Sequence, residues 1–486
     1  MAGSKAAPKV ASNPLARLLG RVRGAGLRLP DTSKCKPWPT RGVLVGGAVR
    51  DLLLGKEPSD LDWLVTDPAA EAERCAALTG GSLFCMDEAR GHWRVVVRQD
   101  AHQTHDYAPL TFLGETSLGG EAGITEAEWL KAAVERDLWR RDLTVNALAL
   151  TETGALIDPT GGAHDLRQRV LRAPRESNLE DDTLRPLRVV RFAATLGFTL
   201  ADQTRATVRS VASRQAAGTA QLPAMERVGA ELTALLLSSG AADGVRLLED
   251  LGLLAVYLPE LADGRGVEQR GLHHLDVLDH NIEALSQLVS GFPDSGTAPR
   301  WATLLHDVGK PATRGADDFG RVTFHGHAHE GARLTGKILE RLRLPGEVVT
   351  KAVGLVRYHM VQLPQDERAA RRFVHRRRAL LPDLLRLMLA DREAARGRRA
   401  SGAGRTAYRL AVARVLAILD EAPPAAPLLR GEDVMELLAL PPGPRVGEAL
   451  AFVAEAVAVG DVADVEGAQQ LLLGYAAAQG WNVKPT

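Results

Sequence analysis

The chain has 486 residues, which is too long for one hydrophobic core and long enough for three or four domains. Its 60 Lys and Arg residues balance 60 Asp and Glu residues, so the net charge excludes a globally basic nucleic-acid binder and leaves only local basic surfaces. Three cysteines are too few for a disulfide framework, and no run approaches the ~20 apolar residues of a membrane helix, which predicts a cytoplasmic protein without a membrane partner.

Residues 1–40 are predicted to form a basic extension. Up to residue 41 the chain carries nine Lys or Arg residues against a single acid, with Ala, Pro and Gly interspersed. This composition favours a solvated tail over an RNA-binding segment by roughly two to one.

Residues 42–67 predict a strand, a glycine turn, a helix and an acidic strand. The apolar run ends at Gly46 and Gly47, where backbone N–H groups and a helix N-terminus favour a phosphate, and Arg50 adds a positive charge one turn later. Asp60 and Asp62 share one face of the next strand because side chains alternate along a strand. A phosphate cradle beside paired carboxylates suits Mg²⁺ and predicts nucleotidyl transfer with release of pyrophosphate.

A helix over residues 68–79 and a valine-rich strand over residues 93–98 are predicted next. Asp106 then stands where this sheet would place a third carboxylate. It is either a third metal-binding or general-base group or a turn residue before Pro109, and the two alternatives carry equal weight. Residues 110–126, rich in Gly, Ser and Glu and without periodicity, predict a mobile loop.

The segment DLWRRDLTVNA, residues 137–147, adds groups suited to a triphosphate. Arg140 and Arg141 can each grip phosphate oxygens with two hydrogen bonds, and Asn146 can bond a sugar or a phosphate. Asp142 is placed to orient the ribose or Arg141. The alternative, a surface cluster of ion pairs, would contribute little stability.

The spacing GG-x-V-R-D-x₈-D-x-D, followed by D-L-x-R-R-D-x-T-x-N-A, is much more specific than any of its parts. It resembles the signature of the class II tRNA nucleotidyltransferase and bacterial poly(A) polymerase family, within the DNA polymerase β-like nucleotidyltransferases. The chain departs from the second motif at Leu143, where the family usually has Phe. The resemblance extends from about residue 41 to residue 474.

This resemblance implies an α+β fold: a polymerase β-like head with a small mixed sheet and helices, then all-helical neck, HD and tail domains. In such a head Mg²⁺ held by Asp60 and Asp62, with Asp106 as a third catalytic group, promotes attack of the tRNA 3′-hydroxyl on CTP or ATP. The nucleotide is expected to contact Gly46, Gly47, Arg50, Arg140, Arg141, Asp142 and Asn146.

Residues 181–198 resemble the family's E-D-x-x-R and R-x-x-R-F pair, with Asp for the usual Glu at the first position. The resemblance implies that Asp182 and Arg185, three apart on one helix face, present a protein template to the incoming base. Arg188 and Arg191 on the same helix complete the expected nucleotide site.

Two further segments are expected to support the template. Residues 156–172 match the family's connector I-D-P-x-G-G-x-x-D-L, which predicts a hinge without a catalytic role. Arg227, in the next helical motif, is expected to buttress the template helix.

A second chemical centre is predicted where histidines become frequent, after residue 272. The order of its residues resembles the HD phosphohydrolase pattern, which occurs fused to members of this family. Imidazoles and carboxylates from separate helices suit one or two divalent ions, such as Mg, Mn, Co or Ni. The predicted ligands are His280, His306, Asp307, His327, His359 and Asp391, and Lys310 is expected to meet a substrate phosphate.

The expected domains are the extension (1–40), the head (41–158), the neck (159–265), the HD domain (266–400) and the tail (401–486). The expected function is template-independent addition of CMP or AMP from CTP or ATP to the tRNA 3′ end, with a metal-dependent phosphohydrolase as a second activity. CC-only, A-only and poly(A) addition are kept as alternatives; CC-only relatives tend to lack a loop at this place, and its presence here leaves the use of ATP open. The rival from another class is an HD phosphohydrolase with an RNA-holding head.

Overall fold

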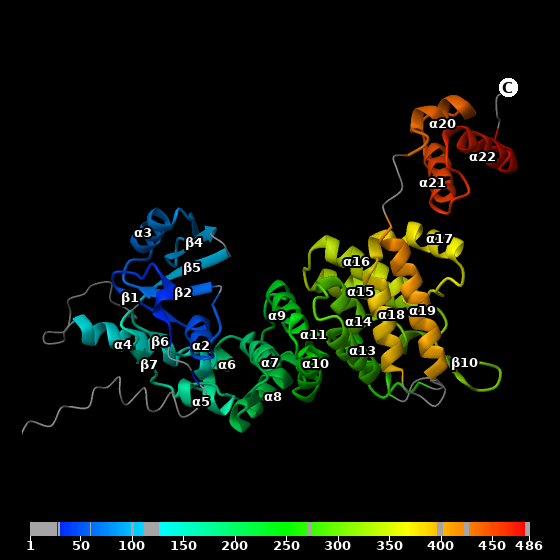
Figure 1. Ribbon diagram of the computed structural model, residues 1–486. Helices are drawn as coiled ribbons and strands as arrows, with labels where there is room; N and C mark the ends of the chain where they lie inside the picture. The colour runs from blue at the N-terminus through cyan, green and yellow to red at the C-terminus, as the bar shows by residue number, and fades with distance from the viewer. Residues whose placement is uncertain are drawn as a thin grey trace, which may run out of the picture. The chain divides into compact units, whose positions relative to one another are not determined.

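The computed structural model describes residues 27, 30–58, 60–98, 102–110, 126–269, 275–395, 402–421 and 427–481. The chain divides into two compact units, Met1–Leu235 with Leu247–Val256, and Leu236–Arg246 with Tyr257–Thr486 (Figure 1). Most of the predicted basic extension and of the predicted loop at 110–126 lies outside the described residues. Among the helices that are described, none combines the length and the apolar character needed to cross a membrane.

The first unit is built on a seven-stranded sheet with the order β3-β4-β5-β2-β1-β6-β7. The strands β2 and β5 run parallel and the other neighbouring pairs run antiparallel, so the sheet is mixed, as predicted. The strands are β1 (Gly42–Val45), β2 (Asp60–Val65), β3 (Ser82–Asp87), β4 (His92–Arg98), β5 (His102–Pro109), β6 (Ala149–Leu150) and β7 (Leu156–Ile157).

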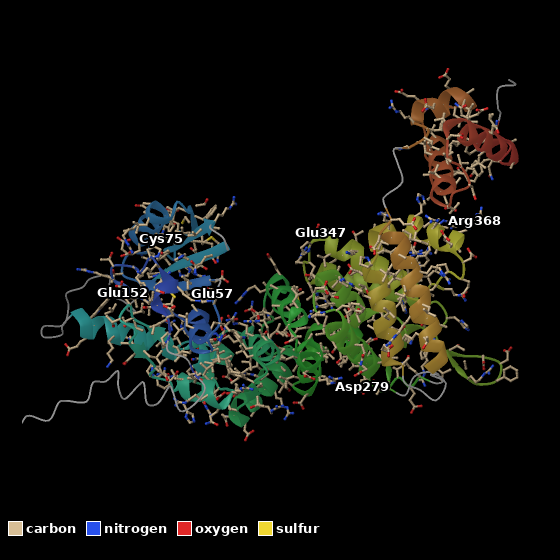
Figure 2. All side chains as sticks on the ribbon, in the orientation of Figure 1. Glu57, Cys75, Glu152, Asp279, Glu347 and Arg368 are labelled. Atoms are coloured by element: carbon tan, nitrogen blue, oxygen red, sulfur yellow. The ribbon has the colours of Figure 1, made fainter. Side chains whose placement is uncertain are left out.

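Helices cover both faces of this sheet (Figure 1). On one face α3 (Pro68–Thr79) packs over β4 and β5 and buries Cys75, which is labelled in Figure 2, near Tyr107. On the other face Val134 of α4 (Glu126–Trp139) joins Leu64 of β2 in a buried apolar cluster. Because side chains alternate along β2, Asp62 points to the same face as Leu64.

The helix predicted over residues 68–79 is confirmed, and its ends show why it forms there. The Asp67 side chain accepts a hydrogen bond from the Ala70 N–H, and Pro68 occupies the first turn. The helix stops at Gly80, whose φ of 67° lies in the left-handed region that glycine tolerates.

The next part of the chain is helical, as predicted, apart from the short pair β8 (Val170–Leu171) and β9 (Thr199–Leu200). One predicted helix is wrong in detail: residues 181–198 hold the last residue of one helix, a break, and then the whole of a second helix. Asp182 is extended between them, with φ −130° and ψ 105°. The helices are α5 (Gly162–Gln168), α6 (Ser177–Asp181), α7 (Arg185–Leu196), α8 (Asp202–Ala216), α9 (Met225–Leu237), α10 (Ala241–Asp250) and α11 (Leu253–Tyr257).

The second unit is helical except for the short hairpin β10 (Gly315–Ala316) and β11 (Val322–Thr323). Its largest buried side chain is Trp301. The helices are α12 (Pro259–Ala262), α13 (Val277–Gly291), α14 (Thr297–Leu305), α15 (His327–Arg341), α16 (Gly346–Tyr358), α17 (Glu367–Arg377), α18 (Asp383–Ala394), α19 (Gly402–Leu419), α20 (Gly431–Leu438), α21 (Pro444–Ala458) and α22 (Val465–Ala478).

Candidate active site and metal centre

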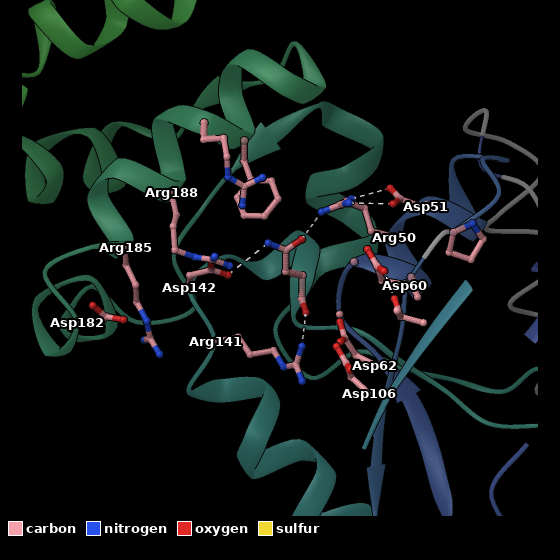
Figure 3. A pocket seen from close by; sticks show the side chains of 18 of the residues that line it. Arg50, Asp51, Asp60, Asp62, Asp106, Arg141, Asp142, Asp182, Arg185 and Arg188 are labelled. Atoms are coloured by element: carbon pink, nitrogen blue, oxygen red, sulfur yellow. Dashed lines mark hydrogen bonds and ion pairs between the residues drawn. The ribbon is translucent and has the colours of Figure 1, made fainter. Parts of the chain in front are cut away.

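A cleft of about 810 Å³ brings together nearly all the side chains predicted for nucleotide transfer. Figure 3 shows carboxylates from the strands on one side of the cleft and Arg185 and Arg188 from α7 on the other. Arg140 is exposed and does not line the cleft. The predicted residues that line it are Gly46, Gly47, Arg50, Asp60, Asp62, Asp106, Arg141, Asp142, Asn146, Asp182, Arg185, Arg188 and Arg191.

Three of these residues form a carboxylate row: Asp60, Asp62 and Asp106. Asp106 lies on β5 directly opposite Asp62 of β2, so it belongs to the sheet and not to a turn. On its other side it faces Arg94 of β4, a residue that the sequence did not single out. The Arg94 Nε and Nη2 donate to the two Asp106 carboxylate oxygens at 2.6 and 2.7 Å. This two-point contact fixes the plane of the Asp106 carboxylate.

The carboxylate row is suited to divalent cations. Burial raises the pKa of Asp62; the Arg141 guanidinium opposes this shift, and the carboxylates of Asp106 and Asp60 raise the pKa further. A cation placed among these oxygens would relieve both the burial cost and the mutual repulsion. Carboxylate oxygens are also the ligands that Mg²⁺ prefers, so the residues present fit the ion.

The glycine turn before α2 (Gly47–Leu53) borders the same cleft. Gly46 has a φ of 76°, and a Cβ added there would lie 2.8 Å from Arg141 Nη1. The positive φ favours glycine at this position, and the absence of a Cβ lets the Arg141 guanidinium lie close to the turn. Arg50 is buried behind the turn, where its Nη1 donates to Asn146 Oδ1 at 2.7 Å and its Nε donates to Asp51 at 2.9 Å.

The opposite wall is held by a second set of ion pairs. Arg188 Nε donates to Asp142 Oδ2 at 2.9 Å, and Arg188 Nη1 donates to Glu231 Oε1 at 3.1 Å. Glu231 also accepts from Arg191, so one carboxylate of α9 holds two arginines of α7. The Arg191 guanidinium lies 3.8 Å from the centre of the Phe192 ring. The sequence motifs did not single out Glu231, so this contact was not predicted.

Asp182 and Arg185 both line the cleft, but they do not form the expected pair on one helix face. Asp182 Oδ1 accepts from the Leu184 N–H at 3.1 Å and Oδ2 accepts from Arg227 Nη2 at 3.0 Å. Arg185 Nη1 instead donates to the Asn178 carbonyl at 2.9 Å. The helix break explains the difference: Asp182 is extended, and its carboxylate accepts from the Leu184 N–H just before α7 and from Arg227.

The second unit contains a separate cluster of imidazoles and carboxylates around Asp307. The Asp307 Oδ1 lies 3.5 Å from His327 Nε2 and 3.6 Å from His359 Nε2. Its Oδ2 lies 3.4 Å from His306 Nε2 and 3.7 Å from His280 Nε2. Asp307 therefore belongs to two groups of side chains that could each hold a metal ion. One group contains His280 and His306, and the other contains His327 and His359.

Asp391 adds a second carboxylate to this cluster. Its Oδ1 lies 2.9 Å from His280 Nε2 and 3.6 Å from His306 Nε2. Burial opposes protonation of His306, yet the carboxylates of Asp307 and Asp391 raise the pKa of His306 to about 10. The centre thus has an excess of negative potential that a divalent cation would neutralise.

The orientation of the rings also fits metal binding. The Nδ1 atoms of His306, His327 and His359 lie 2.9, 2.8 and 2.6 Å from backbone carbonyl oxygens three residues earlier. An Nδ1–H bonded in this way leaves the Nε2 lone pair for a ligand. The Nε2 atoms of His327 and His359 are buried and receive no hydrogen bond from any described residue.

Lys310 does not point to open space. It is buried, and its Nζ donates to Asp307 Oδ2 and to Gln269 Oε1, both at 2.5 Å. In this arrangement Lys310 balances part of the charge of Asp307, and the predicted contact with a substrate phosphate stays a prediction.

Three protein families match parts of the chain. The Poly A polymerase head domain matches residues 43–172, and the family described as a probable RNA and SrmB-binding site of polymerase A matches residues 197–264. The HD domain matches residues 293–396. The head-domain match covers the carboxylate row. The HD-domain match covers every predicted ligand of the histidine cluster except His280.

Relatives of similar length match nearly the whole chain. An A-adding tRNA nucleotidyltransferase of Deinococcus radiodurans is 54% identical over 428 residues, which are 88% of this chain and 93% of the relative. A CC-adding tRNA nucleotidyltransferase of Thermus thermophilus is 46% identical over 436 residues, 90% and 94% of the two chains. The crystal structure of a Bacillus stearothermophilus CCA-adding enzyme with CTP aligns with a TM-score of 0.61 at 23% identity, over 96% of this chain and 99% of that chain.

Proposed function

Since this chain belongs to the family of tRNA nucleotidyltransferases and poly(A) polymerases, we propose that it transfers a nucleoside monophosphate from ATP or CTP to the 3′ end of tRNA without a nucleic-acid template. The observation that carries the proposal is the cleft, in which a row of three carboxylates faces arginines from α2, α7 and the segment after α4. This arrangement suits a polyanionic substrate that reacts beside cations.

In the proposed reaction the RNA 3′-oxygen attacks the α-phosphorus, a new phosphodiester bond forms, and the bond to pyrophosphate breaks. Asp60 and Asp62 would hold Mg²⁺, which supplies Lewis-acid stabilisation of the developing charge. The proton of the 3′-hydroxyl passes to Asp106, whose carboxylate Arg94 holds in a fixed plane beside Asp62.

The remaining cleft residues hold the nucleotide. Gly46, Gly47, Arg50 and Arg141 surround the space proposed for the triphosphate, because they line the cleft next to the carboxylate row. Asn146 accepts from Arg50 through its Oδ1, so its amide also holds that guanidinium in place. Arg188 pairs with Asp142 and, through the shared Glu231 carboxylate, is linked to Arg191; these side chains form the wall proposed to lie behind the sugar.

We propose that the chain adds AMP to tRNA that already ends in CC. The A-adding relative is 54% identical and the CC-adding relative 46% identical, over nearly equal shares of the chain. The test supplies tRNAs that end before the CCA sequence, after C, after CC or after CCA, each with CTP, ATP or both. We expect AMP on the CC end alone; CMP addition to the shorter ends would assign CC or CCA addition, and no incorporation on any end would refute nucleotidyl transfer.

The histidine cluster supports a second candidate function, a metal-dependent phosphohydrolase. The observation that favours it is the convergence of buried, unbonded Nε2 atoms on Asp307. His280, His306, His327, His359, Asp307 and Asp391 are the proposed ligands of one or two ions of Mg, Mn, Co or Ni. Release of phosphate from phosphomonoesters or opening of 2′,3′-cyclic nucleotides, measured with each metal, tests it; absence of hydrolysis with all four would leave a structural metal site or none.

A further inference from the structure

A second cavity, of about 300 Å³, adjoins the cleft in the first unit. The two cavities share one wall, made of Asp62, Arg94, Asp106 and Arg141. These four residues therefore have an open space on each side. The cleft is proposed to hold the nucleotide, and no ligand has yet been proposed for the second cavity.

The second cavity differs in character from the cleft. Its floor is the sheet face that carries Leu64 and Ala108, each two residues beyond a carboxylate of the row. Its outer rim is formed by Met86 and His92, and Met86 is 55% exposed. Gly46 and Arg50, the groups proposed for the triphosphate, line the cleft but not this cavity.

Displacement at phosphorus proceeds in line: the attacking oxygen enters opposite the leaving oxygen. If the leaving pyrophosphate lies on the cleft side, where Arg50 and Arg185 stand, the attacking hydroxyl has to arrive from the other side of the carboxylate row. The second cavity is the space that the described residues leave there.

We propose that this cavity receives the 3′-terminal nucleoside of the RNA that is extended. The inference rests on the proposed nucleotidyl transfer and adds to it the site of the second substrate. The ribose lies against Asp106, which takes the proton of the 3′-hydroxyl, and the base packs on Leu64, Ala108 and Met86. Packing of a base face on side chains, without hydrogen bonds to its edges, holds an unpaired RNA base without reading its sequence.

Arg94 stands at the border of the two spaces and suits the backbone of such an RNA. Its Nε and Nη2 are engaged by Asp106, and no described residue accepts a hydrogen bond from its Nη1. The side chain is 39% exposed, so the remaining N–H groups can meet a phosphate oxygen of the terminal nucleotide. A single guanidinium would then fix both the proton acceptor and the RNA end beside it.

Crosslinking gives a direct positional test with the full-length wild-type chain. A tRNA whose 3′-terminal nucleoside is 4-thiouridine is irradiated on the protein, and the attached peptide is identified by mass spectrometry. We expect attachment within residues 82–98, which hold β3 and β4, or on β2 or β5 at Leu64 or Ala108, against which the base is proposed to pack. Attachment confined to α7 or α9 would overturn the proposal.

A charge at the rim tests the same site by kinetics. Met86→Glu places a carboxylate beside the proposed RNA phosphate and should raise KM for tRNA about tenfold, while KM for the nucleotide stays within about twofold. The matched control is Leu78→Glu on α3, because Leu78 is 64% exposed, also apolar, and does not line the second cavity. It should leave both constants unchanged.

The two proposals fail in different ways. A wild-type protein that adds no nucleotide to any tRNA end refutes nucleotidyl transfer and this inference with it. An active wild type whose Met86→Glu variant keeps the original KM for tRNA refutes the terminal-nucleoside site alone. Thermal unfolding of both variants checks that the exposed substitutions leave the fold intact.

Discussion

Asp62 is the residue on which the proposed chemistry depends most, because it is half-buried beside the Arg141 guanidinium and the carboxylates of Asp106 and Asp60. Asp62→Asn keeps the size of the side chain and removes the charge that would bind a cation. Metal-assisted catalysis contributes several kcal/mol, so incorporation should fall at least about 100-fold while tRNA binding is retained. The control is Asp67→Asn, two residues beyond β2, where Asn can still cap α3. Near-normal incorporation by Asp62→Asn would remove Asp62 from the metal site.

The prediction about which nucleotide base is selected concerns Asp182 and Arg185. Adenine and cytosine both present an exocyclic amino donor, which a carboxylate can accept, whereas uracil presents a carbonyl in its place. Asp182→Ala or Arg185→Ala should therefore relax selection against UTP and GTP about tenfold and slow the use of the correct nucleotide. The neighbouring Asp181 is exposed and does not line the cleft, so Asp181→Ala is the matched control.

Incorporation of all four nucleotides by the wild type and these variants decides the matter. An unchanged preference in Asp182→Ala and Arg185→Ala would assign the two residues to local structure alone. Each residue already has local contacts that would account for such a role: Asp182 accepts from the Leu184 N–H and from Arg227, and Arg185 donates to the Asn178 carbonyl.

The motifs predicted which side chains gather in the cleft better than they predicted their partners. Local spacing places Asp60 and Asp62 on one strand face. The pairing of β2 with β5 then places Asp106 directly beside Asp62. Partners far apart in the chain cannot be derived from spacing: Arg188 and Glu231 are 43 residues apart in sequence. Arg94 was missed for the same reason, since it meets Asp106 only through the pairing of β4 with β5.

At the scale of elements, β1 and α3 were predictable because their ends are marked in the sequence: β1 ends at the Gly46 turn, and α3 begins at the Asp67 cap and ends at Gly80. The edge strand β3 was missed because its side chains are mostly exposed and show no regular alternation. The break between α6 and α7 was also missed, although Asp182 and Thr183 have low helix propensity and Pro186 in the first turn of α7 is a helix-start signal.

The contact between α7 and α9 yields a prediction with a close internal control. Glu231→Gln removes the charge that holds Arg188 and Arg191, so the arginines should lose their fixed positions and KM for the nucleotide should rise about tenfold. The same geometry occurs at Asp250, which pairs with Arg205 and Arg209 of α8 outside the cleft.

Asp250→Asn should therefore leave KM unchanged, although it removes one carboxylate from two arginines in the same way. Steady-state kinetics of both variants, with the nucleotide varied at saturating tRNA, make the comparison. Equal effects of the two substitutions on KM would show that the ion pairs act only through the stability of the helices.

At the scale of the whole molecule, the two chemical centres lie in different compact units. The described residues that line the cleft all precede residue 236, whereas the six proposed metal ligands of the second centre all follow residue 257. Nothing in the described contacts gives the two centres a shared side chain. Their activities should therefore be separable by substitution.

His359→Ala removes one of the buried Nε2 atoms that face Asp307 and should lower the amount of metal that co-purifies with the protein. Loss of one ligand at such a site weakens metal binding by at least about tenfold to 100-fold. The matched control is His329→Ala, because His329 is exposed on α15, two residues after the proposed ligand His327. Elemental analysis after dialysis, with the melting temperature at several metal concentrations, measures both variants.

Bound metal stabilises the folded state by an amount that grows with its concentration, about 2.7 kcal/mol at 100 times Kd. Wild type and His329→Ala should therefore melt at higher temperature as metal is added, and His359→Ala should not respond over the same range. All three proteins should extend tRNA within about twofold of one another, because the cleft keeps its own carboxylates and arginines. A tRNA-extension defect that follows metal loss in His359→Ala would show that the second centre supports the first, against the separation of the two units.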